Sequence, residues 1–440
     1  MSAALVTAPC GKIEGVNENG IRKFLGIPYA RAGRFEYPRE VTHWEGTLSA
    51  VSFGSAPIQA RAYEEYGESE FSRREFMEGV ISEYSEDCLF LNVFAPENAE
   101  GCPVVIAVYG GGLFSGQSDE KVFDGEAFAK RGVILVTFNY RVNIFGFCAM
   151  KELEDESGKC GNYGYYDQHT AFMWVRHNIS AFGGDPDRMS LIGHSAGASS
   201  VETQIKSPLN AGLFKGAVIQ SSAGFATAMK TDKNIEKTYA LWHKVYEKSG
   251  AKSIEEFKTM PAKKLFDAYM AVSGKNPIAF ATAIYDENFT SEVKNKPCPV
   301  NIICSLTSED VLPILFYIMM KKLAKSQRGS GETYFYYFKR QLPGDEYGAW
   351  HGAELQYIYG TLSRSWRPFT QEDYTLSERM TDYICNFAAA GDPNGEGLAR
   401  WDSFYKDKKA MVFDAGESGM KKLSSLKLII SGILRKFPEM

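Results

Sequence analysis

Three segments of the chain hold residue types that together could activate a serine for nucleophilic attack. The first reads LIGHSAGASS and places Ser195 between Gly193 and Gly197, directly after a short apolar run. A serine on a sharp turn between a strand and a helix presents its hydroxyl above a sheet, as a nucleophile requires. A simple strand-to-helix turn that needs glycines is the structural alternative. The motif therefore predicts a nucleophile only if partners occur elsewhere.

The second segment supplies a general base, which a serine hydroxyl needs and which in this arrangement follows it in the chain. Two histidines follow Ser195, namely His243 and His351. His243 lies in LWHKVYE, an amphipathic helical pattern typical of a surface or packing residue. His351 lies in GDEYGAWHGAELQYIYG, a loop bounded by glycines from which a base can reach the serine. We predict His351 as the base and expect His194 to support the site from beside the nucleophile.

The third segment supplies the carboxylate that orients the base, which should follow a late strand. The run PVNIICSL ends in TSED, so Glu309 and Asp310 stand side by side at this point. Spacing alone does not choose between them.

A glycine triplet could stabilise the negative charge that develops on an attacked carbonyl oxygen. Gly110, Gly111 and Gly112 directly follow the apolar run VVIAVY, and glycines let backbone N–H groups turn inward without a side chain in the way. The N–H of Ala196, just after the serine, is the expected further donor. A phosphate-binding loop is excluded because no lysine follows the glycines.

The elements that must position these residues alternate along the chain. Residues 104–109 and 132–138 are continuous apolar runs rich in β-branched residues, typical of strands buried on both faces. Further strands are predicted over 189–192, 215–220 and 299–306, and helices over 120–130, 167–182 and from 196 onward. This alternation predicts an α/β fold with a mostly parallel central sheet and helices on both faces.

The segment 226–296 interrupts that alternation with amphipathic helical patterns such as IEKTYALWHKVYEK. We predict a single domain over residues 1–440, in which 226–296 is a cap or lid inserted over the functional edge of the sheet.

Composition restricts the classes of partner. The 440 residues are 44% hydrophobic and 23% charged, and the net charge of -5 comes without a basic block that would bind nucleic acid or a membrane surface. No apolar run is long enough to span a bilayer and no signal-peptide pattern opens the chain, so we expect a cytoplasmic protein. The eight cysteines lack metal-ligand spacing and are expected to be reduced. No metal, organic cofactor or obligate protein partner is implied.

Five collinear motifs resemble the type-B carboxylesterase family, which also includes cholinesterases and adhesion proteins that lack the catalytic serine. They are FLGIPYA (24–30), SEDCLFLNVFAP (85–96), NYRVNIFGF (139–147), the run from GNYGYYDQ to GHSAG (161–197) and FAAAGDPNGEGLARW (387–401). The resemblance implies an α/β-hydrolase fold and a short, intracellular member of bacterial type. It also implies roles for individual residues: Ser195 as nucleophile, His351 as base, and Gly111, Gly112 and Ala196 as oxyanion donors.

Departures from the family pattern concern the acid and one loop. The acid of the family is a glutamate in a D-E-G motif, where this chain has Ser308-Glu309-Asp310. The match selects Glu309, although two of the three residues differ and Asp310 stays open. Secreted members pair the cysteine matching Cys88 with one upstream, but no cysteine lies between Cys10 and Cys88, so that disulfide is expected to be absent. No tryptophan lies in 58–86, so choline esters are not expected substrates.

The resemblance implies a serine carboxylesterase that releases an acid and an alcohol from a small-molecule ester through an acyl-enzyme. One alternative is a catalytically silent binding protein on the same fold, and another is the same machinery acting on amides, thioesters or lactones. Phe114 beside the glycine triplet and Trp350 beside the base, together with His194, predict a substrate pocket with aromatic walls. Packing roles explain such residues equally well.

Overall fold

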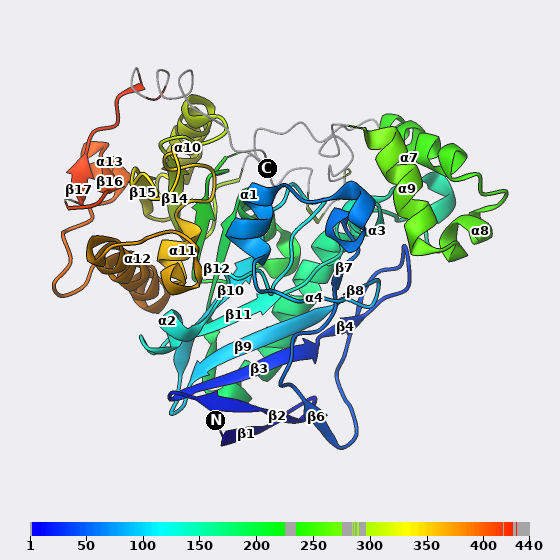
Figure 1. Ribbon diagram of the computed structural model, residues 1–440, viewed down its shortest axis with the longest axis horizontal. Helices are drawn as coiled ribbons and strands as arrows, with labels where there is room; N and C mark the ends of the chain where they lie inside the picture. The colour runs from blue at the N-terminus through cyan, green and yellow to red at the C-terminus, as the bar shows by residue number, and fades with distance from the viewer. Residues whose placement is uncertain are drawn as a thin grey trace.

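One large sheet runs through the molecule (Figure 1). The computed structural model describes residues 2–224, 235–274, 284, 286, 288–289, 296–416, 418–425 and 428. The strands of the main sheet are ordered β1-β2-β3-β9-β11-β10-β12-β13-β14-β15-β16-β17, and β6 pairs with β2 at one side. Neighbours in this order are often far apart in the sequence, so the sheet gathers the segments identified above.

The middle of the sheet is parallel, as predicted from the continuous apolar runs. Its strands are β10 (Cys102–Val108), β11 (Ile134–Phe138), β12 (Gly184–His194), β13 (Gly216–Gln220), β14 (Asn301–Thr307), β15 (Thr333–Phe338) and β16 (Ala410–Phe413). Every residue of β11 and β13 is buried, because helices cover both faces of a parallel sheet. The carboxyl ends of β10, β12 and β14 lead into the glycine triplet, the serine turn and the acidic pair, and the loop with His351 follows β15. These segments therefore meet at one edge of the sheet.

An antiparallel extension flanks the parallel strands and was not predicted from the sequence. It consists of β1 (Ser2–Ala8), β2 (Gly11–Glu18), β3 (Ile21–Pro28) and β9 (Phe90–Pro96). The short strand β6 (Thr47–Ser49) pairs in parallel with β2, and β17 (Gly419–Lys421) pairs antiparallel with β16 at the far side of the sheet. The turn between β2 and β3 is Asn19-Gly20 with φ of 54° and 76°, the signature of a tight hairpin. Short ladders join β4 (Ala30–Arg31) to β5 (Arg39–Glu40), and β7 (Ala56–Pro57) to β8 (Tyr84–Ser85).

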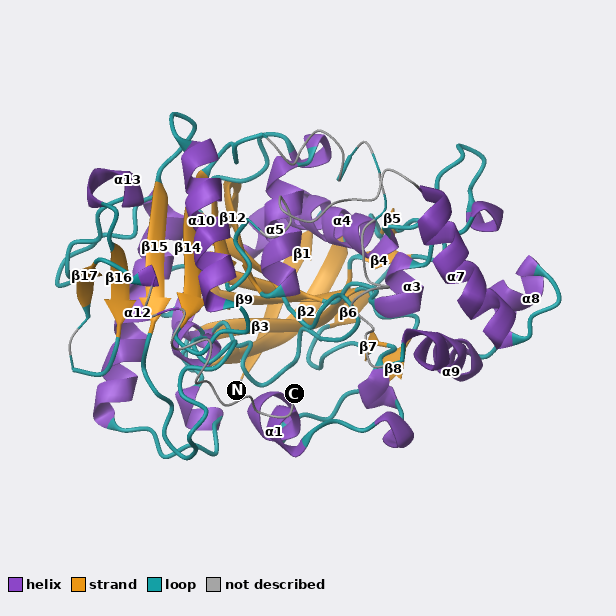
Figure 2. Cartoon of the chain, turned by 90° about the horizontal axis from the view of Figure 1, so that it is seen from above, coloured by secondary structure: helices purple, strands orange, loops and turns teal. Residues whose placement is uncertain are grey.

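Helices cover the two faces of the sheet (Figures 1 and 2). The helices α4 (Tyr163–Asn178) and α5 (Ala196–Lys206) pack on one face, and α2 (Glu126–Ala129) and α12 (Gln371–Ala390) on the other. The predicted helix over 167–182 is α4 followed by the 3-10 turn η5 (Ile179–Phe182). A capping box between Thr370 and Asp373 starts α12, and Gly391 ends it.

The helix α10 (Pro313–Gln327) packs against β14. Shorter helical segments connect the layers. They are η1 (Ala60–Ala62), η2 (Glu64–Tyr66), α1 (Glu70–Ser72), the π-helical η3 (Arg73–Met77), α3 (Asn143–Phe147), η4 (Lys151–Leu153), η6 (Pro208–Asn210), α11 (Leu355–Ile358), η9 (Leu362–Arg364) and α13 (Phe404–Asp407).

The helix predicted over 120–130 forms only as α2 (Glu126–Ala129), so most of that prediction is wrong. The residues before it make a buried turn instead. The Ser118 N–H donates to the Asn139 side chain at 2.8 Å, and the Glu126 N–H donates to Asp124 at 2.7 Å. Side chains that bond the backbone locally compete with the helix for its N–H groups.

The helices α7 (Ile235–Ser249), α8 (Ile254–Thr259) and α9 (Ala262–Ser273) form a group at the opposite end of the molecule from β16 and β17 (Figures 1 and 2). Arg34 holds this group by donating to the Met260 carbonyl at 2.6 Å, and Tyr66 by donating to Asp267 at 2.8 Å. The remainder of the predicted cap lies largely outside the described residues, so its role as a lid stays a prediction.

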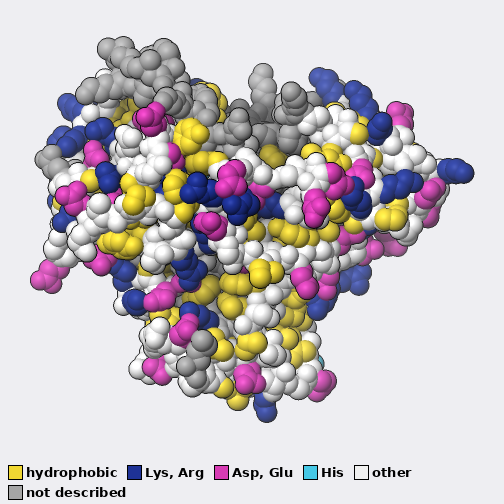
Figure 3. Space-filling view, viewed as in Figure 1, with side chains coloured by type: hydrophobic (Ala, Val, Ile, Leu, Met, Phe, Trp, Pro, Cys, Tyr) yellow, Lys and Arg dark blue, Asp and Glu magenta, His cyan; other side chains and the backbone are white. Residues whose placement is uncertain are grey.

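The surface charges, the helices and the cysteines can each be compared with what the composition predicts. On the face in Figure 3, Lys and Arg side chains are interspersed with Asp and Glu. Within the described ranges, no helix combines the length and the apolar character that a membrane crossing needs. All eight cysteines lie in the described part of the chain and none is paired there, Cys88 included. The cytoplasmic location stays a prediction.

A buried ion pair fixes α4 against the loop after β11. Arg141 donates to both oxygens of Asp167 at 2.8 and 2.7 Å, and their side chains are 4% and 0% exposed. We expect Arg141→Met to lower the free energy of unfolding by about 3–5 kcal/mol, because it leaves a buried carboxylate unpaired. The exposed pair of Arg31 and Asp87 is the control, and Arg31→Met should cost about 0–1 kcal/mol. Urea unfolding followed by circular dichroism measures both, and equal losses would contradict the expectation.

Candidate active site

Ser195 sits at the junction of β12 and α5 in a strained backbone conformation. Its φ is 57° and its ψ is -126°, which few non-glycine residues adopt. A Cβ on Gly193 would lie 2.5 Å from the Gly197 carbonyl oxygen, and one on Gly197 would overlap the carbonyl oxygen of Val108. The two glycines therefore allow the close packing that makes so sharp a turn possible, which explains the sequence motif around the serine.

His351 lies between Ser195 and an acidic side chain. Its Nε2 is 2.8 Å from Ser195 Oγ, and its Nδ1 is 2.6 Å from Asp310 Oδ1. The side chain of His351 is 13% exposed and that of Asp310 is fully buried. The nucleophile and base predicted from the sequence are thus brought into hydrogen-bond contact over a separation of 156 residues.

The structure corrects the choice of Glu309 as the acid beside His351, because Asp310 occupies that position. The Glu309 backbone forms a bridge with Trp350, and its side chain accepts from the Ala349 N–H at 2.8 Å. Side chains of successive residues in extended backbone point to opposite sides. With Glu309 paired to the loop that carries the base, Asp310 is the residue that points to His351.

The charges at the site reinforce one another. Burial alone would raise the pKa of Asp310, but the charge of His351 and the hydrogen bonds from His351 and the Thr307 N–H, with the nearby Ser221 hydroxyl, hold that pKa below its ordinary value. Burial alone would lower the pKa of His351, but the Asp310 carboxylate raises it above its ordinary value. The pair therefore favours an imidazolium beside a carboxylate once a proton reaches His351.

The glycine triplet begins beside Ser195. A Cβ on Gly110 would lie 3.2 Å from the Ser195 Cβ. Gly111 and Gly112 have φ of 99° and 65°, in the region where glycine is favoured. Ala196 begins α5, so its N–H is one of the four donors at a helix start that lack a partner within the helix. The first glycine of the triplet thus lies close to Ser195, and Ala196 follows that serine directly.

The predicted pocket residues occupy different environments. Trp350 is 2% exposed and packs edge-on against Phe71 and Phe76, which is a core position. The His194 ring centre lies 4.5 Å from that of His351. Burial and the neighbouring His351 lower the pKa of His194 well below its ordinary value, so it stays neutral. Phe114 is half-buried on the loop after the glycines.

His243 lies away from this site, as predicted. Its Nε2 is 3.2 Å from Glu152, and about two fifths of its side chain is exposed. It behaves as a surface residue of α7.

Glu354 was missed by the sequence reading. It is fully buried beside His351 and Asp310, and burial raises its pKa to about 8. Ser221, which lowers the pKa of Asp310, was missed as well. Glu354 follows His351 by three residues and Ser221 follows β13, but neither position forms a distinctive sequence pattern. Only the tertiary structure therefore identifies these two residues. Across the described ranges, no three His, Cys, Asp or Glu side chains come together as metal ligands.

Comparison with known proteins identifies the family of this chain. The model of the carboxylesterase family matches residues 2–328 and 305–428. The chain is 29% identical to bile salt-activated lipase from Bos taurus, over 90% of this chain and 81% of the relative. It is 38% identical to para-nitrobenzyl esterase from Bacillus subtilis, over 51% of this chain and 44% of that esterase.

Solved structures extend the likeness to the fold. A thermophilic PNB esterase superposes with a TM-score of 0.82 at 25% identity, covering 96% of this chain and 99% of its own. A carboxylesterase from Geobacillus stearothermophilus superposes with a TM-score of 0.79 at 25% identity, covering 97% and 99%. The serine turn, the parallel sheet and these matches lead to one conclusion: the protein belongs to the carboxylesterase family and is a carboxylic ester hydrolase on the α/β-hydrolase fold.

Proposed function

We propose that this protein hydrolyses carboxylic esters through an acyl-enzyme on Ser195, with His351 as general base and Asp310 as the acid that orients it. The observation that carries the proposal is the continuous contact from Ser195 Oγ to His351 Nε2 and from His351 Nδ1 to Asp310 Oδ1, at 2.8 and 2.6 Å. These distances are within the range in which a base can take the proton it must abstract.

In the first half of the reaction, Ser195 Oγ bonds to the ester carbonyl carbon while its proton passes to His351 Nε2. The carbonyl oxygen becomes an oxyanion that accepts hydrogen bonds from the N–H groups of Gly111, Gly112 and Ala196. The imidazolium is stabilised by Asp310 and then protonates the leaving alkoxide. The alcohol departs and the acyl group stays on the serine.

In the second half, a water molecule takes the place of the alcohol. His351 accepts a proton from the water as its oxygen bonds to the acyl carbon. The same N–H groups hold the second oxyanion, and His351 returns the proton to Ser195 Oγ as the acid leaves. The residues end in their starting protonation states, so no cofactor is required by this sequence of steps.

Activity should depend on pH through the base. We expect kcat/KM to fall about tenfold per pH unit on acidification, because only neutral His351 can accept the serine proton. The pKa of His351 is raised above its ordinary value, so the half-maximal point should lie above pH 6.5. Hydrolysis of p-nitrophenyl butyrate from pH 5 to 9 at constant ionic strength measures this. A flat profile between pH 5 and 8 would count against His351.

The first experiment is hydrolysis of p-nitrophenyl acetate, butyrate and octanoate, combined with labelling by a fluorophosphonate. We expect release of nitrophenol and a single phosphonate adduct on the peptide that contains Ser195. The dependence on acyl length begins to define a pocket to which we assign Phe114. Neither turnover nor adduct would favour the silent binding protein, once amide, thioester and lactone substrates have also been tried.

We further propose that the segment 226–296 borders the entrance for the ester. Its described helices are anchored to the short helices η2 and η4 by Tyr66 on Asp267 and by Tyr239 on Glu154, at 2.8 and 2.9 Å. Deleting the segment should therefore change KM and the preferred acyl length more than it changes kcat for p-nitrophenyl acetate.

A further inference from the structure

The loop that carries the glycine triplet has no regular secondary structure between β10 and Ser118, so its shape must come from other contacts. Four of its residues have positive φ: Gly111 at 99°, Gly112 at 65°, Leu113 at 64° and Gly116 at 110°. Residues in such conformations persist only when their surroundings fix them.

A peptide unit is planar, so contacts that restrain its carbonyl oxygen also fix the direction of its N–H. The Gly111 N–H shares one rigid peptide unit with the Gly110 carbonyl, and the Gly112 N–H shares one with the Gly111 carbonyl. The Gly111 carbonyl accepts from the N–H groups of Phe114 and Ser115 at 3.1 and 3.0 Å. The turn within the loop thereby sets the direction of the Gly112 N–H.

The Gly110 carbonyl is restrained by packing against Gly116. A Cβ on Gly116 would lie 2.5 Å from that oxygen and 2.5 Å from the ring of Tyr109. The backbone of Gly116 is therefore in direct contact with the peptide that carries the Gly111 N–H, and a shift of Gly116 would let this peptide rotate.

Gln59 holds Gly116 from outside the loop. Its Oε1 accepts from the Gly116 N–H at 2.9 Å, and its Nε2 donates to the Gly116 carbonyl at 3.2 Å. Gln59 is itself fully buried, and its Nε2 also donates to Gln117 Oε1 at 3.2 Å and to the Pro57 carbonyl at 3.3 Å. Its carboxamide thus fixes both hydrogen-bonding groups of one glycine.

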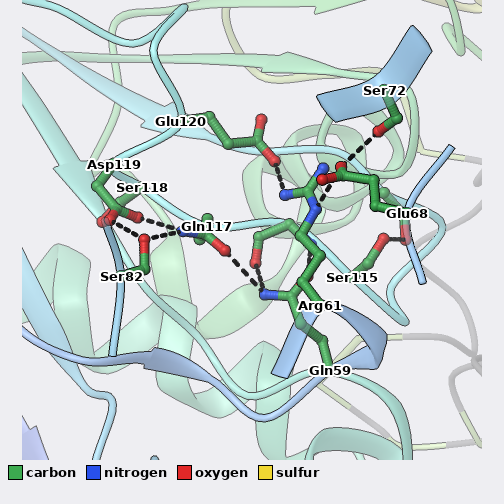
Figure 4. Close-up of polar contacts among 12 residues, drawn as sticks. Gln59, Arg61, Glu68, Ser72, Ser82, Ser115, Gln117, Ser118, Asp119 and Glu120 are labelled. Carbon is green, nitrogen blue, oxygen red and sulfur yellow. Dashed lines mark hydrogen bonds and ion pairs between the residues drawn. The ribbon is translucent and has the colours of Figure 1, made fainter. Parts of the chain in front are cut away.

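The segment around Gln59 is anchored to the same stretch of chain. Figure 4 shows Arg61 reaching Glu68 and Glu120, with contacts of 2.8 and 2.6 Å. In the same view Gln117 donates to Ser82 and Asp119 at 2.7 and 2.8 Å. These contacts keep Gln59 from moving independently of the residues that follow the glycine loop.

We propose that Gln59 is a positioning residue for the oxyanion hole, which clamps Gly116 and so fixes the Gly110–Gly111 peptide against Ser195. The inference rests on the proposed function, in which Gly111 donates to the oxyanion. Gln59 touches no reacting atom and acts through Gly116. Its loss should weaken the stabilisation of the oxyanion more than the binding of the ester.

The test compares Gln59→Leu with a matched control, Gln327→Leu. Gln327 is equally buried and makes the same kind of clamp, since it accepts from the Cys298 N–H and donates to the Cys298 carbonyl, both at 2.7 Å. Gln327 ends α10, and its partner Cys298 lies just before the amino end of β14, away from the serine at the carboxyl end of β12. Both substitutions remove a buried carboxamide, so losses of thermal stability should be similar.

The readouts are kcat and KM for p-nitrophenyl butyrate and the Ki of an alkyl trifluoromethyl ketone. Ser195 Oγ bonds to the ketone carbon, its proton passes to His351, and the ketone oxygen becomes an oxyanion held by the same donors. For Gln59→Leu we expect kcat to fall and Ki to rise by about 10- to 100-fold, with KM within threefold, because one misdirected donor costs up to about 10²- to 10³-fold. For Gln327→Leu, kcat and Ki should stay within threefold of the unmodified protein.

Equal and small changes in kcat and Ki for the two variants would overturn the inference, because Gln59 would then be a structural residue only. If Gln59→Leu is not recovered folded, Gln59→Glu carries the test. It keeps the acceptor for the Gly116 N–H and should show a smaller loss of the same kind, while an unchanged Ki would overturn the inference. An unmodified protein that neither hydrolyses esters nor binds the ketone would instead overturn the proposed function.

Discussion

Replacement of Ser195 by alanine is expected to lower kcat for p-nitrophenyl butyrate by about 10⁵- to 10⁶-fold, because no acyl-enzyme can form without the hydroxyl. Residual turnover should come only from the remaining hydrogen-bond donors and from binding, and the variant should no longer react with a fluorophosphonate. Folding should change little, since the Ser195 backbone N–H still donates to the Gln220 carbonyl at 2.9 Å.

Ser199→Ala is the matched control for that experiment. Ser199 lies one turn further along α5 than Ser195. Its hydroxyl hydrogen-bonds with the hydroxyl of Ser222, at 2.6 Å, rather than with His351. We expect kcat within threefold of the unmodified protein. Comparable turnover in Ser195→Ala and the unmodified protein would mean that another group is the nucleophile or that the measured hydrolysis is background.

The second prediction with a large expected effect concerns the adjacent carboxylates Glu309 and Asp310. Asp310→Asn should lower kcat by about 10⁴-fold, because an amide at His351 Nδ1 no longer holds the tautomer that accepts the serine proton and no longer stabilises the imidazolium. Loss of the carboxylate also removes the charge that raises the pKa of His351, so the acidic limb of the pH profile should move to lower pH.

Glu309→Gln provides the comparison at the neighbouring position. The carboxamide keeps an oxygen to accept from the Ala349 N–H, so we expect kcat within tenfold of the unmodified protein. A pH profile measured for both variants separates their roles. A larger loss of kcat in Glu309→Gln than in Asp310→Asn would contradict the assignment of Asp310 as the acid. It would instead support Glu309, the residue that the family motif indicated.

The two carboxylates show how far the sequence could lead at this site. Spacing placed Glu309 and Asp310 correctly at the end of a strand, and the likeness to other members selected Glu309. The structure selects Asp310 instead, because the bridge between Glu309 and Trp350 determines which of the two successive side chains faces His351. A pairing between segments some 40 residues apart carries no local signal, because it is formed only when both reach the same edge of the sheet.

The helix predicted over 120–130 failed for a related reason. Its composition suits a helix, but the Asp124 side chain accepts from the Glu126 N–H at 2.7 Å, a group that a helix from residue 120 would use internally. The Lys121 N–H donates to the Phe76 carbonyl at 2.9 Å, so contact with a distant segment outweighed a weak local preference.

The sequence by itself determined the parallel middle of the sheet, the serine turn and the choice of His351 over His243. Each of these follows from a local pattern of apolar runs, glycines or helical spacing. Only the tertiary structure decided that Asp310 faces His351, that Glu354 is buried beside it, and that Gln59 bonds Gly116 in the glycine loop. Each of these depends on which atoms from distant segments meet in a buried space. Burial there sets both the pKa of a group and the need to satisfy its hydrogen bonds.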